Sequence, residues 1–200
     1  MNRPAHPRYR AVDPSPEHLA LVDALRALQD DVTAAAPPPE VAAEVADLLG
    51  AASARLRGWA VPEREQVTGR GRANGVLGRS QAFVPRVHLD TWDGTVAEGT
   101  VTFGRHHLGG NGAAHGGALP LLFDDLLGRL VNARGRPVSR TAYLHVEYRS
   151  ITPIDRPLRV AARIDRHEGR KWWVSGALHD GDVLCAEAAA LFVVLRPDQP

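Results

Sequence analysis

The feature that most constrains the fold is a glycine-rich segment that leads directly into an apolar helix. Residues 109–117 read Gly-Gly-Asn-Gly-Ala-Ala-His-Gly-Gly, and residues 118–131 are apolar on almost every side. Pro120 has no N–H and fits only among the first few helical positions, which places the helix start at about Gly116 or Gly117. Because a helix that is apolar nearly all round must be buried, the rest of the fold has to enclose it.

Strand-like segments lie on both sides of this helix in the sequence. Two of them precede it and are separated by the turn-forming pair Asp93-Gly94, and four follow it, separated by short proline or glycine segments. The predicted strands are 83–89, 96–103, 139–151, 157–167, 171–179 and 183–195. A curved antiparallel sheet wrapped around the helix, an α+β fold, satisfies this order. Such a sheet has open edges, so we expect two copies to pair edge to edge.

A separate region precedes this domain, which we expect at residues 82–197. Residues 1–14 suggest a flexible leader, and Ser15-Pro16-Glu17 has the composition of a helix start. An apolar stripe at helical spacing predicts a helix that ends before Pro37, and a second apolar stripe predicts a helix that begins near Glu40 and stops at Gly58. The first stripe contains Leu19, Val22, Leu25, Leu28 and Val32. Residues 15–58 should therefore form a helical hairpin, with the Arg- and Gly-rich residues 59–81 as a connector.

The composition excludes several classes of function. With 24 basic and 23 acidic residues and a net charge of +1, the whole chain carries no field that would favour nucleic acid. No apolar segment is long enough to span a membrane, and no secretory signal is present, so we expect a cytoplasmic protein. The single cysteine, Cys185, lies in an apolar segment and is interpreted as a buried thiol. Phosphate-binding, dinucleotide-binding and serine-hydrolase motifs are absent.

Two adjacent acids on the apolar helix differ in their helical neighbours. Asp125 shares a face with Arg129, which an ion pair between residues one turn apart explains. Asp124 lies in a row with Gly117, Leu121 and Gly128, where an unpaired carboxylate is costly unless it is functional. The alternative is that Asp124 caps a strand or accepts from a buried hydroxyl. A functional carboxylate can attack a thioester as a nucleophile or activate a water, and the sequence leaves both open.

The glycines at the helix start have amides without partners inside the helix, and these amides can stabilise an oxyanion. A glycine pair that only lets the helix pack closely on the sheet is the alternative. Gly117 and Asp124 are seven residues apart, about 10 Å along the helix, which exceeds direct reach. A site shared by two chains would solve this. His115 can orient the loop or bind a carbonyl, and we expect no metal from His106, His107 and His115 because their spacing is irregular and no Cys joins them.

At this point the residues resemble a known family. The segment from His115 through Gly116 and Gly117 to Asp124 resembles the His-Gly-Gly motif with an acid nine positions on in PaaI-like hotdog acyl-CoA thioesterases. The segment 141–153, Thr-Ala-Tyr-Leu-His-Val-Glu-Tyr-Arg-Ser-Ile-Thr-Pro, resembles the strand after the central helix in the same superfamily. The likeness covers about residues 82–196 and is closer to members that act on fatty acyl chains.

The resemblance implies a hotdog fold, acyl-CoA substrates, no cofactor, and a homodimer or dimer of dimers with sites at the interface. It implies that Asp124 is the catalytic acid, that Gly117 donates to the thioester carbonyl, and that Thr141 helps to hold the water. Thr141 can equally be an ordinary strand residue. Gly116, Asn111 and Arg149 are expected to bind substrate. Many members have Asn six residues before the motif histidine. This chain has Gly109 at that position and Asn111 two residues closer to the histidine, so it departs from the family pattern here.

Three functions remain open from the sequence. Hydrolysis of acyl-CoA is the leading hypothesis. A hotdog hydratase or dehydratase would use an Asp/His pair on an enoyl thioester, and a non-catalytic acyl-CoA or lipid carrier would bind without turnover.

The phosphates of CoA require a local basic cluster, for which Arg149, Arg170 and Lys171 are candidates. Arg170 and Lys171 are also explained as solvated residues of a turn.

Overall fold

The computed structural model describes residues 14–62, 65–67, 76–78, 80–133 and 135–196. The predicted leader up to residue 13 and residues 68–75 of the predicted connector lie outside the described residues. The helices are α1 (Pro16–Ala34), α2 (Pro39–Arg57) and α3 (Ala118–Val131), with a 3-10 turn, η2 (Arg105–His107). The strands are β1 (Val76–Leu77), β2 (Val87–Trp92), β3 (Val96–Thr102), β4 (Leu108–Gly110), β5 (Ala113–Ala114), β6 (Ser139–Tyr148), β7 (Pro157–Glu168), β8 (Lys171–Asp180) and β9 (Val183–Val194).

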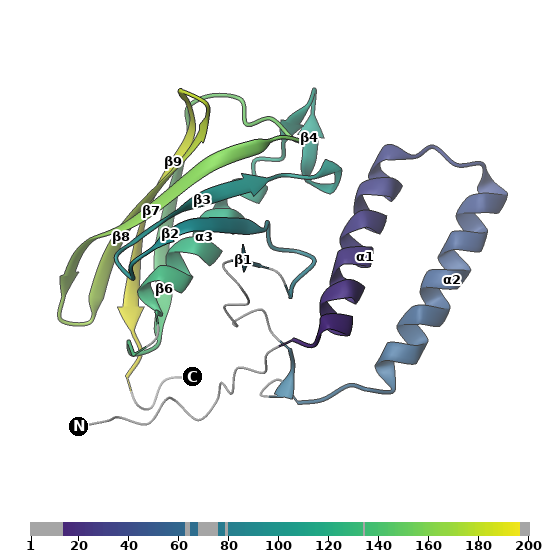
Figure 1. Cartoon of the computed structure of the whole chain (residues 1–200), viewed down its shortest axis with the longest axis horizontal. Coiled ribbons are helices and arrows are strands. Elements are labelled where there is room, and N and C mark those ends of the chain that lie inside the picture. Colours follow the sequence, from purple (N-terminus) through teal and green to yellow (C-terminus); the bar gives the residue numbers. More distant parts are fainter. Residues whose placement is uncertain (1–13, 63–64, 68–75, 79, 134, 197–200) are drawn as a thin grey trace.

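One curved antiparallel sheet encloses α3, as the sequence predicts. Its seven strands lie in the order β1-β2-β3-β7-β8-β9-β6, and β4 and β5 form a separate pair. Figure 1 shows the sheet wrapped around α3. The four strands after α3 start and end within a few residues of the predicted runs, because Pro153 lies between β6 and β7 and the left-handed Gly169 and Gly181 lie in the next two turns.

The core lies between α3 and the concave face of the sheet. Eight residues of the helix are buried: Ala118, Leu119, Leu122, Phe123, Leu126, Leu127, Leu130 and Val131. Phe123 is completely buried and packs over Gly176 of β8, where a Cβ would lie 3.1 Å from the phenyl ring. The absence of a side chain at Gly176 therefore lets the helix approach the sheet closely.

The first predicted strand is displaced. The sequence predicts a strand at 83–89, whereas β2 spans Val87–Trp92 and residues 81–86 form an irregular segment. Pro85 cannot donate to a strand ladder, so the strand begins after it. Phe83 is 68% exposed, and the segment is held instead by hydrogen bonds from α1.

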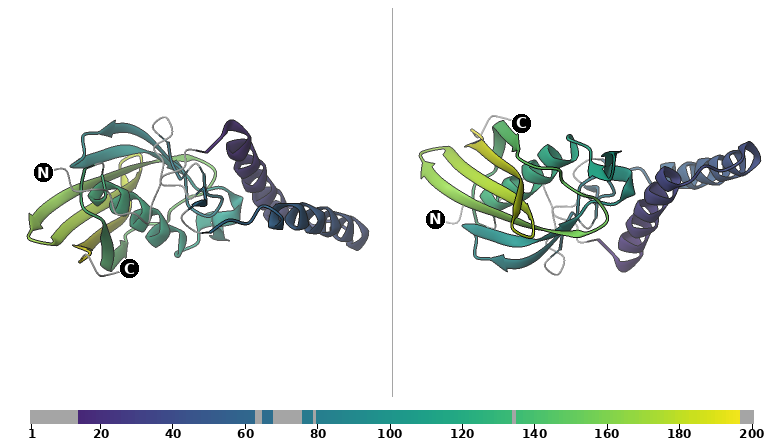
Figure 2. Two further views of the ribbon diagram at one scale, coloured as in Figure 1. Left: turned by 90° about the horizontal axis from the view of Figure 1, so that it is seen from below. Right: turned by 90° about the horizontal axis from the view of Figure 1, so that it is seen from above.

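Two helices precede the sheet, as predicted. Ser15 caps α1 by accepting from the N–H of His18, and Pro37 and Pro38 separate the helices. Figure 2 shows α1 next to the sheet domain and α2 extending away from it. Of the apolar stripe predicted on α1, only Val22 is buried, and Leu25 is 45% exposed. No residue of α2 is buried. Among the described residues, no helix is both long enough and apolar enough to cross a bilayer.

Strand β6 occupies one end of the sheet. It pairs with β9 on one side, and none of the described strands pairs with it on the other. The register shifts between Thr141 and Tyr143, so a bulge lies in the first half of the strand. A ten-residue edge strand of this kind is a template for pairing with another chain.

Candidate active site

Asp124 and Thr141 are brought together across the junction of α3 and β6. The Thr141 hydroxyl donates to Asp124 Oδ1 at 2.8 Å, and both residues are exposed in the single chain. Thr141 adjoins the β6 bulge, and bulges commonly redirect side chains near functional sites. The contact brings together two candidate site residues that lie 17 positions apart in the sequence.

The surroundings of Asp124 differ from the apolar stripe that its helical row suggests. Leu121 and Gly128 are half-buried, but Asp124 itself faces outward beside the open edge of β6. Asp125 is half-buried and pairs with Arg129 at 2.7 Å, as predicted. With the described residues, Asp124 forms no ion pair. Of the two acids, it is therefore the one whose negative charge is not balanced by a cation of the described chain.

The His115-Gly116-Gly117 segment, called the motif loop below, is held by hydrogen bonds within itself and to the first residue of α3. The Gly117 N–H donates to His115 Nδ1 at 3.0 Å, and the His115 carbonyl accepts from Ala118 N–H at 2.8 Å. Gly117 is the residue immediately before α3, and no side chain caps the helix there. Because Nδ1 accepts a hydrogen bond, a neutral His115 ring carries its proton on Nε2. The loop thus presents both a ring N–H and the start of a helix to solvent.

Tyr148 is a residue of this loop region that the sequence analysis did not single out. Its hydroxyl donates to the Gly116 carbonyl at 2.8 Å, so the end of β6 is tied to the start of α3. Tyr148 lies within the segment 141–153 that resembles the family strand, but a tyrosine in a strand is usually explained by packing. No spacing in the sequence links residue 148 to residue 116.

The remaining predicted substrate-binding residues lie on exposed turns and strands. Asn111 is exposed and left-handed, with φ 48°, in the turn between β4 and β5. Arg149 forms ion pairs with Glu187 and Glu147, and the hydrogen bond to Glu187 raises the pKa of its guanidinium. Arg170 donates to the Val194 carbonyl at 2.8 Å. The charge of Arg149 is therefore already balanced by two carboxylates within the chain.

The three histidines considered for a metal differ in their contacts. His106 contacts Asp30 through Nδ1, His107 is buried beside Phe103, and His115 bonds Gly117. Among the described residues, no group of three or more His, Cys, Asp or Glu side chains is arranged to hold a metal ion.

Comparison with known proteins places this geometry in context. No protein-family model matches the chain. Acyl-coenzyme A thioesterase THEM4 of Mus musculus is 34% identical over 99 residues, which is 48% of this chain and 42% of the relative. The Rattus norvegicus protein of the same name is 33% identical over the same shares. The chain thus spans less than half the length of these curated relatives.

The solved structures decide the fold. The crystal structure of a thioesterase superfamily protein has a TM-score of 0.76 and 28% sequence identity, and the match covers 91% of this chain and 97% of that one. This chain has the hotdog fold of the thioesterase superfamily. The match is too long to be confined to the hotdog domain, so it extends into the N-terminal region. A Streptococcus mutans UA159 protein bound to acetyl CoA has the same fold, with TM-score 0.51, 17% identity, and 55% and 88% coverage.

Proposed function

We propose that this hotdog protein hydrolyses acyl-CoA thioesters to a free acid and CoA, with Asp124 as the reacting carboxylate. The observation that carries the proposal is the hydrogen bond from Thr141 to Asp124 at the open edge of the sheet. A carboxylate held by one hydroxyl, with no cation of the described chain beside it, keeps lone pairs free to take a proton. Two facts about similar proteins support the substrate class: the curated relatives are acyl-coenzyme A thioesterases, and the Streptococcus mutans protein of the same fold is bound to acetyl CoA.

The contact with Thr141 favours the water-activation route over direct attack. The hydroxyl uses its hydrogen on Asp124, so its own lone pairs are available to accept a hydrogen from a water. Asp124 then removes a proton from that water as its oxygen bonds to the thioester carbonyl carbon. When the C–S bond breaks, the electron pair leaves with the CoA sulfur, which takes up the proton from Asp124.

The oxyanion that forms needs hydrogen-bond donors, and the motif loop offers them. His115 Nε2–H is a donor while Nδ1 accepts from Gly117. The Gly117 N–H would join it by exchanging its present acceptor, the Nδ1 atom of the exposed His115 ring, for the substrate oxygen. A preorganised donor of this kind is typically worth a hundredfold to a thousandfold in rate.

The site is proposed to be completed by a second copy of the chain. Gly117 and Asp124 lie on one helix about 10 Å apart, so a single carbonyl group cannot contact both within one chain. Pairing of two β6 edges would cover the open strand and bring the Asp124 of one protomer towards the motif loop of its partner. The same pairing would take Asp124, exposed in the single chain, out of bulk solvent.

The test is a thiol-release assay on the purified protein with acyl-CoAs of several chain lengths. Asp124→Asn should reduce kcat/KM at least about a hundredfold. Asp125→Asn is the matched control, because its carboxylate is committed to Arg129 on the same helix, and it should retain most of the activity. Full activity of Asp124→Asn would contradict the mechanism.

Two other outcomes would assign a different function. Tight acyl-CoA binding with no thiol release from the wild-type protein would indicate a carrier or sensor. Water addition to crotonyl-CoA without thiol release would indicate a hydratase.

A further inference from the structure

Helix α1 docks on the hotdog domain through a polar face. Arg26 donates to three backbone carbonyls: that of Gly78, directly after β1, and those of Gln81 and Val84 in the irregular segment before β2. Asp23 pairs with Arg86 in the same region. Burial lowers the pKa of Arg26 to about 10, so the guanidinium remains charged at neutral pH. Together with the buried Val22 of the apolar stripe, these contacts hold α1 against the sheet domain.

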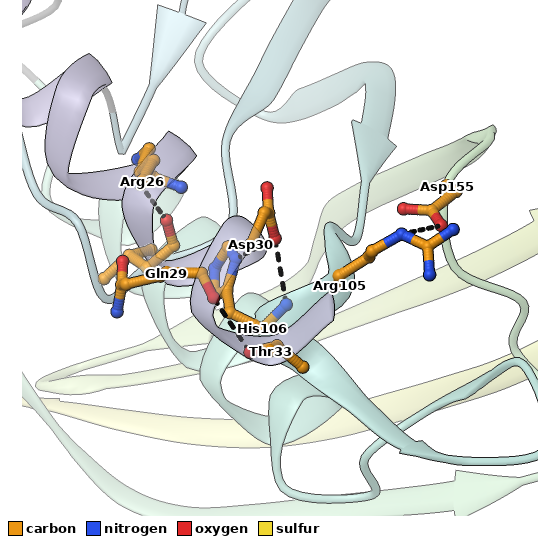
Figure 3. Close-up of polar contacts among 8 residues, drawn as sticks. Arg26, Gln29, Asp30, Thr33, Arg105, His106 and Asp155 are labelled. Atoms are coloured by element: carbon orange, nitrogen blue, oxygen red, sulfur yellow. Dashed lines mark hydrogen bonds and ion pairs between the residues drawn. The ribbon is translucent and has the colours of Figure 1, made fainter. Parts of the chain in front are cut away.

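The most specific contact of this face joins Asp30 to η2. Asp30 Oδ1 accepts from the His106 backbone N–H at 2.9 Å and lies 2.6 Å from His106 Nδ1 (Figure 3). The carboxylate also lies against Gly104, where a Cβ would be 2.6 Å from Oδ1. Burial alone would raise the pKa of Asp30, but the hydrogen bonds from the His106 backbone and ring outweigh it, and the pKa is lowered. Asp30 therefore fixes both the backbone and the ring of η2.

The turn η2 is bonded directly to the motif loop. The His107 carbonyl accepts from the His115 N–H at 2.6 Å, and Gly109 approaches the His115 backbone so closely that a Cβ would lie 2.8 Å from the His115 Cα. His115 in turn accepts from Gly117. A continuous series of hydrogen bonds and backbone contacts thus runs from α1 through η2 to the start of α3.

We propose that Asp30 is a positioning residue for the His115-Gly116-Gly117 loop. By holding His106, it sets the place of the His107 carbonyl, which holds the His115 backbone and through it the donors offered to the substrate oxygen. The inference rests on the proposed thioesterase function for its kinetic consequence. It assigns to the N-terminal helix a role in the reaction although α1 supplies no group that touches the reacting atoms.

The test compares three variants of the full chain: Asp30→Ala, Asp30→Asn and, as the matched control, Asp31→Asn. Asp31 is the exposed acid next along α1. Misplaced oxyanion donors weaken the transition state more than substrate binding, so Asp30→Ala should lower kcat about tenfold or more and change KM less than about threefold. Asp30→Asn keeps an acceptor oxygen for the His106 N–H and should recover part of kcat. Asp31→Asn should match the wild type.

Amide hydrogen exchange provides a readout that does not depend on activity. In Asp30→Ala, the His115 and Gly117 amides should exchange about tenfold faster than in the wild type, while core amides of β8 and β9 stay unchanged. If Asp30→Ala fails to fold, Asp30→Asn decides, with smaller changes of the same sign.

The outcomes separate the two proposals. A wild-type protein that releases no thiol would refute the proposed function, and the exchange data would still decide whether Asp30 orders the loop. Wild-type kcat and wild-type exchange at His115 in Asp30→Ala would overturn the inference. A loss of activity caused only by global destabilisation would also overturn it, and would appear as faster exchange throughout the core.

Discussion

His107, the last residue of η2, makes the stability of the protein depend on pH. The His107 side chain is buried, with 8% of the residue exposed, and its ring packs edge-on against Phe103. Burial lowers the pKa of His107 to about 4, and the neighbouring His106 and Arg26 act in the same direction, while Asp30 opposes them. The ring is therefore neutral in the folded protein at neutral pH.

The sign and size of the effect follow from proton linkage. Between pH 6.5 and pH 4, the unfolded chain binds a proton at His107 and the folded chain does not, so the free energy of unfolding decreases as pH falls through this range. With these two pKa values, the protein loses about 2 kcal/mol between pH 7.5 and pH 5 through this residue. Solvent contact of the ring reduces this, and a loss of about 1–2 kcal/mol is expected.

The assay is chemical denaturation at pH 7.5 and pH 5 of the wild type and His107→Gln. Other titrating groups are common to both proteins and cancel in the difference. The wild type should lose about 1–2 kcal/mol more than the variant over this interval, whatever the absolute stability of the variant. Equal pH dependence of the two proteins would refute the account of His107 as a buried neutral ring.

Three further predictions concern the core, the edge and the site. Phe123→Ala should lower the free energy of unfolding by about 3–5 kcal/mol in denaturant titrations, whereas Phe83→Ala, at an exposed position, should change it little. Ala142→Pro lies at the β6 bulge, where proline is tolerated, and should convert a dimer into a monomer in sedimentation experiments without unfolding it. Thr141→Ala should lower kcat about tenfold and Thr141→Ser should retain it, since only the hydroxyl contacts Asp124.

The fold was largely predictable because its signals are local. Proline and glycine place the start of α3, and turn residues separate strands β6 to β9, so the helix and the later strands agree with expectation. The shift of the first strand to Val87 depends on α1, whose Arg26 holds the carbonyls before Pro85. That contact joins residues far apart in sequence, and no local pattern contains it.

The candidate site was predictable only where helical spacing or family resemblance applies. The pairing of Asp125 with Arg129 follows from their separation by one turn, and the meeting of Asp124 and Thr141 agrees with the resemblance. The apolar stripe of α1 was a poor guide to its docking face, because hydrophobic periodicity cannot detect a face held by Arg26 and Asp30. Partly buried polar contacts of this kind become visible only when both partners are placed in space.

The central claim is that the carboxylate of one protomer acts opposite the loop of its partner, and subunit mixing tests it most directly. Asp124→Asn and Gly117→Val, in which the added side chain would press on the His115 ring, should each be inactive alone. A mixed dimer contains one site with both residues intact, so co-expression should restore about a quarter of the wild-type activity. Two inactive proteins that remain inactive when their mixed dimer has been shown to form would contradict the shared site.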